Sequence, residues 1–234
     1  MDFNTLAFLG FFALTAVLYY ALPKAIKPVL LLAASYCFYL YKPENARLVV
    51  LLISATVITW CSGYAISASC KPGVRRFFLV LSILTCGGIL FFYKYFNFFS
   101  AAIGGKDATL LDLTAPLGLS YFTFQSLSYT PDLYQKKIPR EKNFLYYALF
   151  VSFFPCIFTG PIERAGHLLP QLHQPARFSY EGAAGGAFRM LWGYVKKMVV
   201  ADNLNIFIAA VYGSADKMSG PLLVTASLLF SLRL

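Results

Sequence analysis

Two histidines, His167 and His173, are the side chains in this sequence best suited to proton transfer or metal binding. They lie six residues apart with Pro170 between them, a spacing that does not bring two imidazoles together on one face of a regular helix. The sequence therefore predicts no metal site. We expect both histidines to lie in a proline-rich loop, partly exposed near a membrane surface, and not to be catalytic.

A second group of polar side chains lies within an apolar segment, Pro116–Tyr129, which carries several hydroxyl groups and Gln125. In lipid such groups need partners, so we expect the segment to face other helices or a water-filled cavity rather than acyl chains. Pro131 disfavours helical backbone at the residue before it. The helix is therefore predicted to end at Thr130, before the charged loop Asp132–Lys142.

The chain beyond this loop alternates between apolar and proline-containing segments. Phe144–Phe158 predicts a further membrane-spanning segment, interrupted by Pro155. From Thr159 to Tyr180 the prolines predict irregular backbone, which is tolerated at membrane depth only where protein or a cavity shields it. We therefore expect a re-entrant or interfacial segment there.

A helix is predicted over Ala183–Val200, and it carries the cations Arg189, Lys196 and Lys197. Spacings of seven and eight residues place the arginine on the same helix face as the two lysines. Charge at the centre of a bilayer is unfavourable. We therefore expect this helix to lie at the membrane interface, with its cations toward headgroups or an aqueous pocket.

The elements that position these groups must be membrane helices, as the composition indicates. Of 234 residues, 59% are hydrophobic and 13% are charged, whereas about a quarter of the residues in a soluble domain are charged. Apolar blocks nearly free of charge predict four transmembrane helices within residues 1–99. These blocks are Phe3–Leu22, Pro28–Tyr41, Leu48–Ser69 and Phe77–Phe99. The sequence therefore predicts an all-α polytopic membrane protein with a single membrane domain over residues 1–234.

The net charge of +10 comes from Lys and Arg in short loops between the apolar blocks. This distribution is typical of the positive-inside bias, and no basic stripe with interleaved aromatics favours nucleic-acid binding. Up to residue 143, the loops at 24–27, 71–76 and 136–142 hold nine Lys and Arg, against three in the alternate loops. The amino terminus is therefore predicted to be external.

Four segments together carry a resemblance to a known family. They are Leu18–Pro23, Pro116–Tyr129 with its continuation to Tyr134, Asn143–Arg164 and Gly193–Asn203. They resemble the bacterial branch of the membrane-bound O-acyltransferases, the alginate and peptidoglycan O-acetyltransferases. The resemblance covers nearly the whole chain, with departures at Pro131 and at Gln135–Lys136.

The resemblance implies a ring of tilted helices, incomplete here, whose centre carries out acyl transfer. The family continues into an Asp-Phe-Ser-Gly-Tyr segment and a helix with an invariant histidine, whereas this chain ends at Leu234. We therefore expect a truncated, inactive N-terminal portion without the catalytic histidine. Signature segments and interfacial helices are expected over residues 116–234. The resemblance implies six residues that line the cavity or the donor site: Gln125, Gly160, Pro161, Arg164, Lys196 and Lys197.

The implied reaction moves an acyl group, expected to be acetyl, from a cytosolic thioester such as acetyl coenzyme A to a hydroxyl of an extracytoplasmic polysaccharide. No bound cofactor is expected; the implied partners are membrane lipid and an extracytoplasmic transfer protein, and the implied location is the bacterial inner membrane. Two alternatives stay open, a small transporter or channel and a noncatalytic remnant. No internal repeat, which is common in transporters, supports the first. The simpler alternatives to these implied roles are headgroup contact for the two lysines and helix packing for the other four residues, Gln125, Gly160, Pro161 and Arg164.

Overall fold

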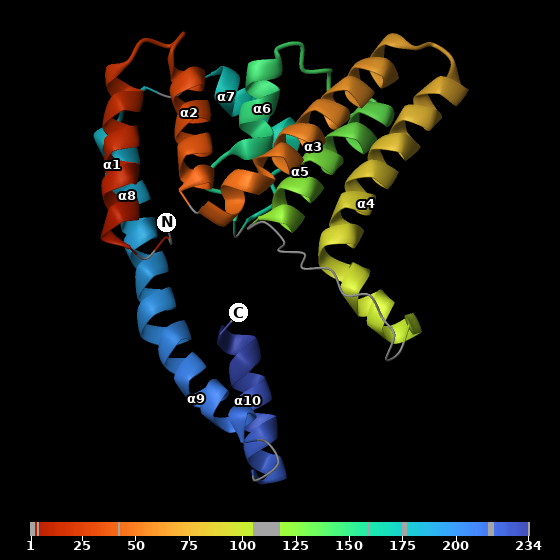
Figure 1. Ribbon diagram of the computed structural model, residues 1–234. Helices are drawn as coiled ribbons and strands as arrows, with labels where there is room; N and C mark the ends of the chain where they lie inside the picture. Colours follow the sequence, from red (N-terminus) through yellow and green to blue (C-terminus); the bar gives the residue numbers. More distant parts are fainter. Residues whose placement is uncertain are drawn as a thin grey trace. The chain divides into compact units, whose positions relative to one another are not determined.

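The computed structural model describes residues 3, 5–41, 43–104, 118–158, 160–174, 177–214 and 218–233. Every regular element in these ranges is a helix (Figure 1), so the predicted all-α fold is confirmed. Contacts divide the chain into two compact units, Met1–Ala176 and Arg177–Leu234, and each is described by itself. The single membrane domain over residues 1–234 stays a prediction.

The first unit contains seven helices among its described residues. They are α1 (Leu6–Ala21), α2 (Lys27–Leu40), α3 (Pro43–Ala68), α4 (Pro72–Gly104), α5 (Leu119–Tyr134), α6 (Phe144–Ser152) and α7 (Ala165–His173). Local capping starts two of them: the Thr5 hydroxyl accepts the N–H of Phe8 at 3.2 Å, and the Asn143 side chain accepts the N–H of Leu145 at 3.0 Å. Such caps satisfy N–H groups that have no partner within the helix.

All four apolar blocks of the first hundred residues form helices, α1 to α4. Two helical stretches, Leu48–Ala68 and Pro72–Ile103, are long and apolar enough to cross a membrane. The helices α1 and α2 are also apolar but contain 16 and 14 residues. Spanning by these two helices therefore requires their flanks or a thinner bilayer. The external amino terminus stays a prediction.

Helix α5 lies at the centre of the first unit. It runs beside α3 and α4, and it also contacts α6 and α7 (Figure 1). One face of α5 is buried, with Phe122, Ser126 and Tyr129 inaccessible to solvent. The polar segment identified in the sequence is thus covered by other helices, as expected, in the part that the structure describes; residues 116 and 117 lie outside that part.

The predicted end of α5 at Thr130 is wrong, because the helix continues through Pro131 to Tyr134. A proline at this position cannot donate a hydrogen bond to the carbonyl of Leu127. The Thr130 hydroxyl lies 3.3 Å from that same carbonyl oxygen and donates to it. A neighbouring threonine can replace a missing backbone donor in this way, so the proline is tolerated within the helix.

The predicted membrane span over residues 144–158 is also wrong. Helix α6 has nine residues and ends at Ser152, whereas a span needs about twenty. Pro155 lacks the N–H that would continue the helix and restricts Phe154 before it. The N–H of Phe154 instead donates to the hydroxyl of Ser35 on α2, at 3.2 Å. All six residues from Tyr147 to Ser152 are buried, so α6 is a core helix of the unit.

The second unit consists of α8 (Tyr180–Val195), a π-helical turn (Lys196–Ala201), α9 (Asp202–Gly213) and α10 (Gly220–Arg233). Figure 1 shows α10 returning alongside α9, and the hydroxyls of Tyr212 and Ser227 lie 3.0 Å apart. The Ser179 hydroxyl caps α8 by accepting the N–H of Gly182 at 3.3 Å. The prediction of one helix over residues 183–200 missed the π turn, which inserts a residue into the helical register.

Candidate functional site

Gln125 is held inside the first unit by a backbone partner. Its side chain is 2% exposed, and its Nε2 donates to the carbonyl oxygen of Phe150 on α6 at 2.6 Å. This hydrogen bond joins α5 to α6 and satisfies a polar group that would be unfavourable in an apolar core. This contact directly supports a role of Gln125 in helix packing.

Hydroxyl groups make two further connections between helices around α5. The Tyr147 hydroxyl of α6 donates to the hydroxyl of Thr59 on α3 at 2.8 Å. The hydroxyls of Ser82 on α4 and Thr130 on α5 lie 2.9 Å apart. Because these groups are buried, each bond fixes how neighbouring helices pack. The polar segment therefore gives the unit a specific helix arrangement.

We predict that Gln125→Leu lowers the free energy of unfolding by about 1 kcal/mol, because the buried carbonyl of Phe150 loses its donor while the volume is nearly retained. Unfolding of the purified protein in mild detergent, followed by circular dichroism against temperature, measures the change. Gln135→Leu is the matched control, since Gln135 is exposed just beyond α5. Equal stability of the Gln125 variant and the wild type would contradict the assigned packing role.

The segment Cys156–Arg164 lies against the amino-terminal end of α5. Gly160 has a φ of +75°, and its N–H donates to the carbonyl of Cys156 at 3.0 Å. A Cβ atom at Gly160 would lie 3.0 Å from the ring of Tyr121 on α5. Glycine thus fits both the backbone conformation and the close approach. Pro161 and Arg164 are exposed, and Arg164 is the residue that directly precedes α7, where its side chain makes no capping hydrogen bond.

The histidines lie on helix α7, so the prediction that they lie in a loop is wrong. Burial of Leu168 and Leu169 gives this short helix its packing energy despite Pro170. The Nδ1 atom of His167 lies 2.9 Å from a carboxylate oxygen of Glu163, and its Nε2 lies 3.1 Å from the amide nitrogen of Gln171. The expected partial exposure is confirmed, because the His167 side chain is 68% exposed.

His173 belongs to a separate cluster. Its Nε2 lies 2.8 Å from a carboxylate oxygen of Glu141, and its ring stacks on Tyr146 with 3.9 Å between centroids. A carboxylate that orients an imidazole is a common arrangement in proton transfer. The sequence reasoning overlooked both glutamates, although the spacing of Glu163, His167 and Gln171 at four-residue intervals was a visible signal. No metal-binding cluster is present among the described residues.

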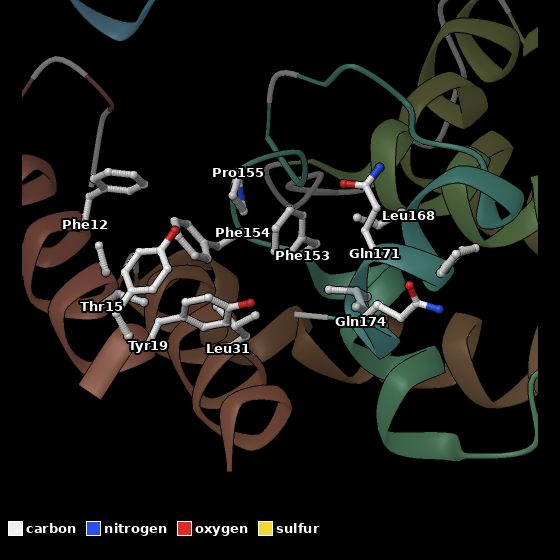
Figure 2. Close-up of a pocket in the computed structure, with 14 residues that line it drawn as sticks. Phe12, Thr15, Tyr19, Leu31, Phe153, Phe154, Pro155, Leu168, Gln171 and Gln174 are labelled. Atoms are coloured by element: carbon white, nitrogen blue, oxygen red, sulfur yellow. The ribbon is translucent and has the colours of Figure 1, made fainter. Parts of the chain in front are cut away.

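A pocket of about 620 Å³ opens beside α7, within the first unit. Figure 2 shows Phe12 and Tyr19 of α1 on one side, Gln171 and Gln174 at α7 on the other, and the turn at residues 153–155 between them. Its lining is mainly apolar with a few polar groups, as in many ligand pockets. The six residues selected from the sequence are not among the residues that line it.

Lys196 and Lys197 lie in the π-helical turn of the second unit, and both are exposed. The Lys197 ammonium pairs with the carboxylate of Asp202, and the Lys196 ammonium lies 5.7 Å from the ring centroid of Trp192. π-Helical turns occur frequently at functional sites. The predicted position of the two lysines at an aqueous or headgroup boundary stays a prediction, as do the roles of all six selected residues.

The helical architecture and the buried polar contacts described above are those of a helical membrane protein. The chain is 31% identical over 228 residues to a probable alginate O-acetylase of Pseudomonas syringae pv. tomato, covering 91% of this chain and 43% of that protein. It is 30% identical to a probable alginate O-acetylase of Azotobacter vinelandii, covering 98% of this chain and 48% of that protein.

The peptidoglycan O-acetyltransferase of Helicobacter pylori is also 30% identical, with 93% of this chain and 46% of that protein covered. The chain thus spans less than half the length of these curated relatives. No protein-family model matches it, and no solved structure matches it. The resemblance seen in the sequence is confirmed: over nine tenths of its length the chain is similar to bacterial proteins named as alginate O-acetylases and as a peptidoglycan O-acetyltransferase.

Proposed function

We propose that this chain forms part of a membrane-bound O-acyltransferase that acetylates a polysaccharide. The observation that carries the proposal is the similarity of nine tenths of the chain to proteins named as alginate and peptidoglycan O-acetyltransferases. These relatives are more than twice as long as this chain. The proposed activity is therefore that of the whole protein, to which these residues contribute their membrane helices.

The proposed reaction transfers the acetyl group of a cytosolic thioester, such as acetyl coenzyme A, to a polysaccharide hydroxyl on the other side of the inner membrane. The hydroxyl oxygen forms a new bond to the acyl carbon, the thiolate leaves, and a general base accepts the hydroxyl proton. In a route through a protein partner outside the membrane, a hydroxyl of that partner would displace the thiolate first, and the polysaccharide hydroxyl would then take the acetyl group and release the partner's hydroxyl. The membrane helices α3 and α4 support a location in a bilayer.

We further propose that Gly160, Pro161 and Arg164 border the reaction cavity, and that Lys196 and Lys197 face the phosphates of the donor. The exposed guanidinium of Arg164 and the exposed lysines are suited to anionic groups. Gln125 is proposed to contribute from α5, within the first unit. Acetyl transfer per folded molecule separates this contribution from packing when Gln125→Leu is placed in the exchange protein described below: a fall in that normalised activity supports the contribution.

The test is an exchange of homologous segments. Residues 1–234 replace the matching region of the alginate O-acetylase of Pseudomonas syringae in cells that lack their own copy, and transfer of labelled acetyl groups to alginate is measured. We expect the exchange protein to restore acetylation, because the segment is homologous along 91% of its length. The matched control carries the corresponding segment of the Azotobacter vinelandii relative.

Residues 1–234 expressed alone are a second control and are expected to transfer no acetyl groups, since the relatives use more than twice this length. The proposed function would be wrong if the exchange protein reached the membrane in normal amounts without acetylating alginate, while the Azotobacter control was active. Acetylation by residues 1–234 alone that was lost on His167→Ala would instead place the general base on α7.

A further inference from the structure

Two pockets of different character adjoin within the first unit. The larger, of about 620 Å³, is lined mostly by apolar side chains of α1, α2, the turn after α6 and α7. The smaller, of about 500 Å³, is lined by Lys24, Ala25, Tyr146, His173 and Gln174. Gln174 lines both pockets. The apolar pocket and the polar pocket therefore lie on either side of one side chain, that of Gln174, just beyond the end of α7.

The larger pocket suits a hydrocarbon chain. Phe12, Leu31 and Phe153 give it aromatic and aliphatic walls (Figure 2). Thr15 also lines it, but the Thr15 hydroxyl donates to the carbonyl of Phe11 at 2.8 Å, so it needs no partner from a ligand. The Gln171 amide is likewise engaged with His167. These two polar groups of the pocket therefore impose little cost on an apolar occupant.

The polar end carries positive charge. Lys24 is exposed in the turn between α1 and α2 and lines the smaller pocket. Nearby along the chain, the Lys27 ammonium lies 4.5 Å from the ring centroid of Tyr19, which lines the larger pocket. No carboxylate is among the described residues that line either pocket; Glu141 approaches only as the partner of His173. This distribution complements an anionic group attached to an apolar tail.

Helix α1, which lines part of the larger pocket, also carries exposed aliphatic side chains. Leu14 and Val17 on α1 are 60% and 67% exposed, and they neighbour the pocket residues Thr15 and Ala16 along the chain. In a membrane protein such exposed aliphatic side chains contact acyl chains. Helix α1 therefore offers acyl chains an apolar surface and also contributes side chains to the larger pocket.

We infer that the two pockets together form a binding site for an anionic phospholipid, with one acyl chain in the larger pocket and the phosphate beside Lys24. Juxtamembrane lysines attract anionic headgroups, and a basic pocket between membrane helices is a common headgroup site. The phosphate accepts hydrogen bonds from the lysine ammonium, while Gln174 lies where the two pockets meet. This site is separate from the proposed acyl transfer, and its test does not require that activity.

The test measures lipid retained by the purified protein. The protein is reconstituted in nanodiscs that contain phosphatidylglycerol and phosphatidylethanolamine in equal amounts, then transferred to detergent, and native mass spectrometry counts the bound lipids. We expect the wild type to retain one lipid, enriched in phosphatidylglycerol. Lys24→Gln should reduce that enrichment about fivefold, whereas Lys71→Gln, an exposed cation that lines neither pocket, should leave it unchanged.

A second pair of variants tests the acyl-chain pocket. Leu31→Trp places a large ring in the pocket and should abolish lipid retention, whereas Val29→Trp, at an exposed position of the same helix, should not. If Leu31→Trp does not fold, as judged by circular dichroism, Ala16→Leu fills the pocket with a smaller change. A wild type that retains no lipid, an unchanged lipid preference in Lys24→Gln, or full retention in the folded pocket-filling variant would each overturn the inference.

Discussion

Replacing Gly118 by alanine is expected to lower the free energy of unfolding of the first unit by roughly 3 to 5 kcal/mol. Gly118 precedes α5 with a φ of +79°, a conformation that costs other residues about 1 to 2 kcal/mol. In addition, a Cβ atom there would lie 2.2 Å from the carbonyl oxygen of Ile157. That oxygen belongs to the backbone, so relief requires the turn after α6 to move.

The measurement is the unfolding midpoint of the purified protein in detergent, together with the amount of folded protein recovered from membranes. Gly87→Ala is the matched control, because nothing lies within 4 Å of a Cβ atom at that position of α4. Alanine favours a helix over glycine by about 1 kcal/mol, so the control should be neutral or slightly stabilising. Equal behaviour of the two variants would show that the turn does not pack against Gly118.

The second large effect is expected at Gly63, where α3 approaches α5. A Cβ atom there would lie 2.6 Å from the ring of Tyr129 and 2.9 Å from a methyl carbon of Leu133. The tyrosine cannot move freely, because its hydroxyl accepts the N–H of Glu141 at 2.9 Å and its ring packs on Tyr147. We therefore expect Gly63→Ala to lower the free energy of unfolding by about 1 to 3 kcal/mol, the usual cost of overpacking.

The same unfolding measurement applies, with Gly88→Ala as the control since nothing lies within 4 Å of a Cβ atom there. A further readout follows from the position of Glu141, which pairs with His173. A displaced Tyr129 would disturb the backbone at Glu141, so lipid retention by the two adjoining pockets should fall in Gly63→Ala and not in the control. A variant as stable as the wild type would contradict the close packing of α3 against α5.

Both glycines place α5 against its neighbours, and this helix links the features proposed to act in function. The turn after α6 packs on Gly118, and the segment around Gly160 packs on Tyr121 of α5. The Tyr129 hydroxyl at the other end of α5 holds the backbone of Glu141. Changes in α5 are therefore expected to affect both the segment before α7 and the pocket beside His173.

The class of the protein was predictable from the sequence because it depends on composition and on the length of apolar blocks. Four such blocks became α1 to α4, and the polar residues around Gln125 became buried against other helices. The similarity to alginate and peptidoglycan O-acetyltransferases was predictable as well, since segments such as Asn143–Arg164 carry a recognisable pattern. These are local or compositional properties, and they do not require knowledge of which helices touch.

Only the tertiary structure determined the features that depend on contacts between different helices. Pro131 stays inside α5, where the hydroxyl of Thr130 replaces its missing donor and also lies 2.9 Å from the hydroxyl of Ser82 on α4. The histidines lie on α7 because burial of Leu168 and Leu169 stabilises a short helix that propensity alone would not form. The pairing of His173 with Glu141 joins residues 32 positions apart. Such contacts between distant segments, and the pockets that lie between them, arise only when the helices pack.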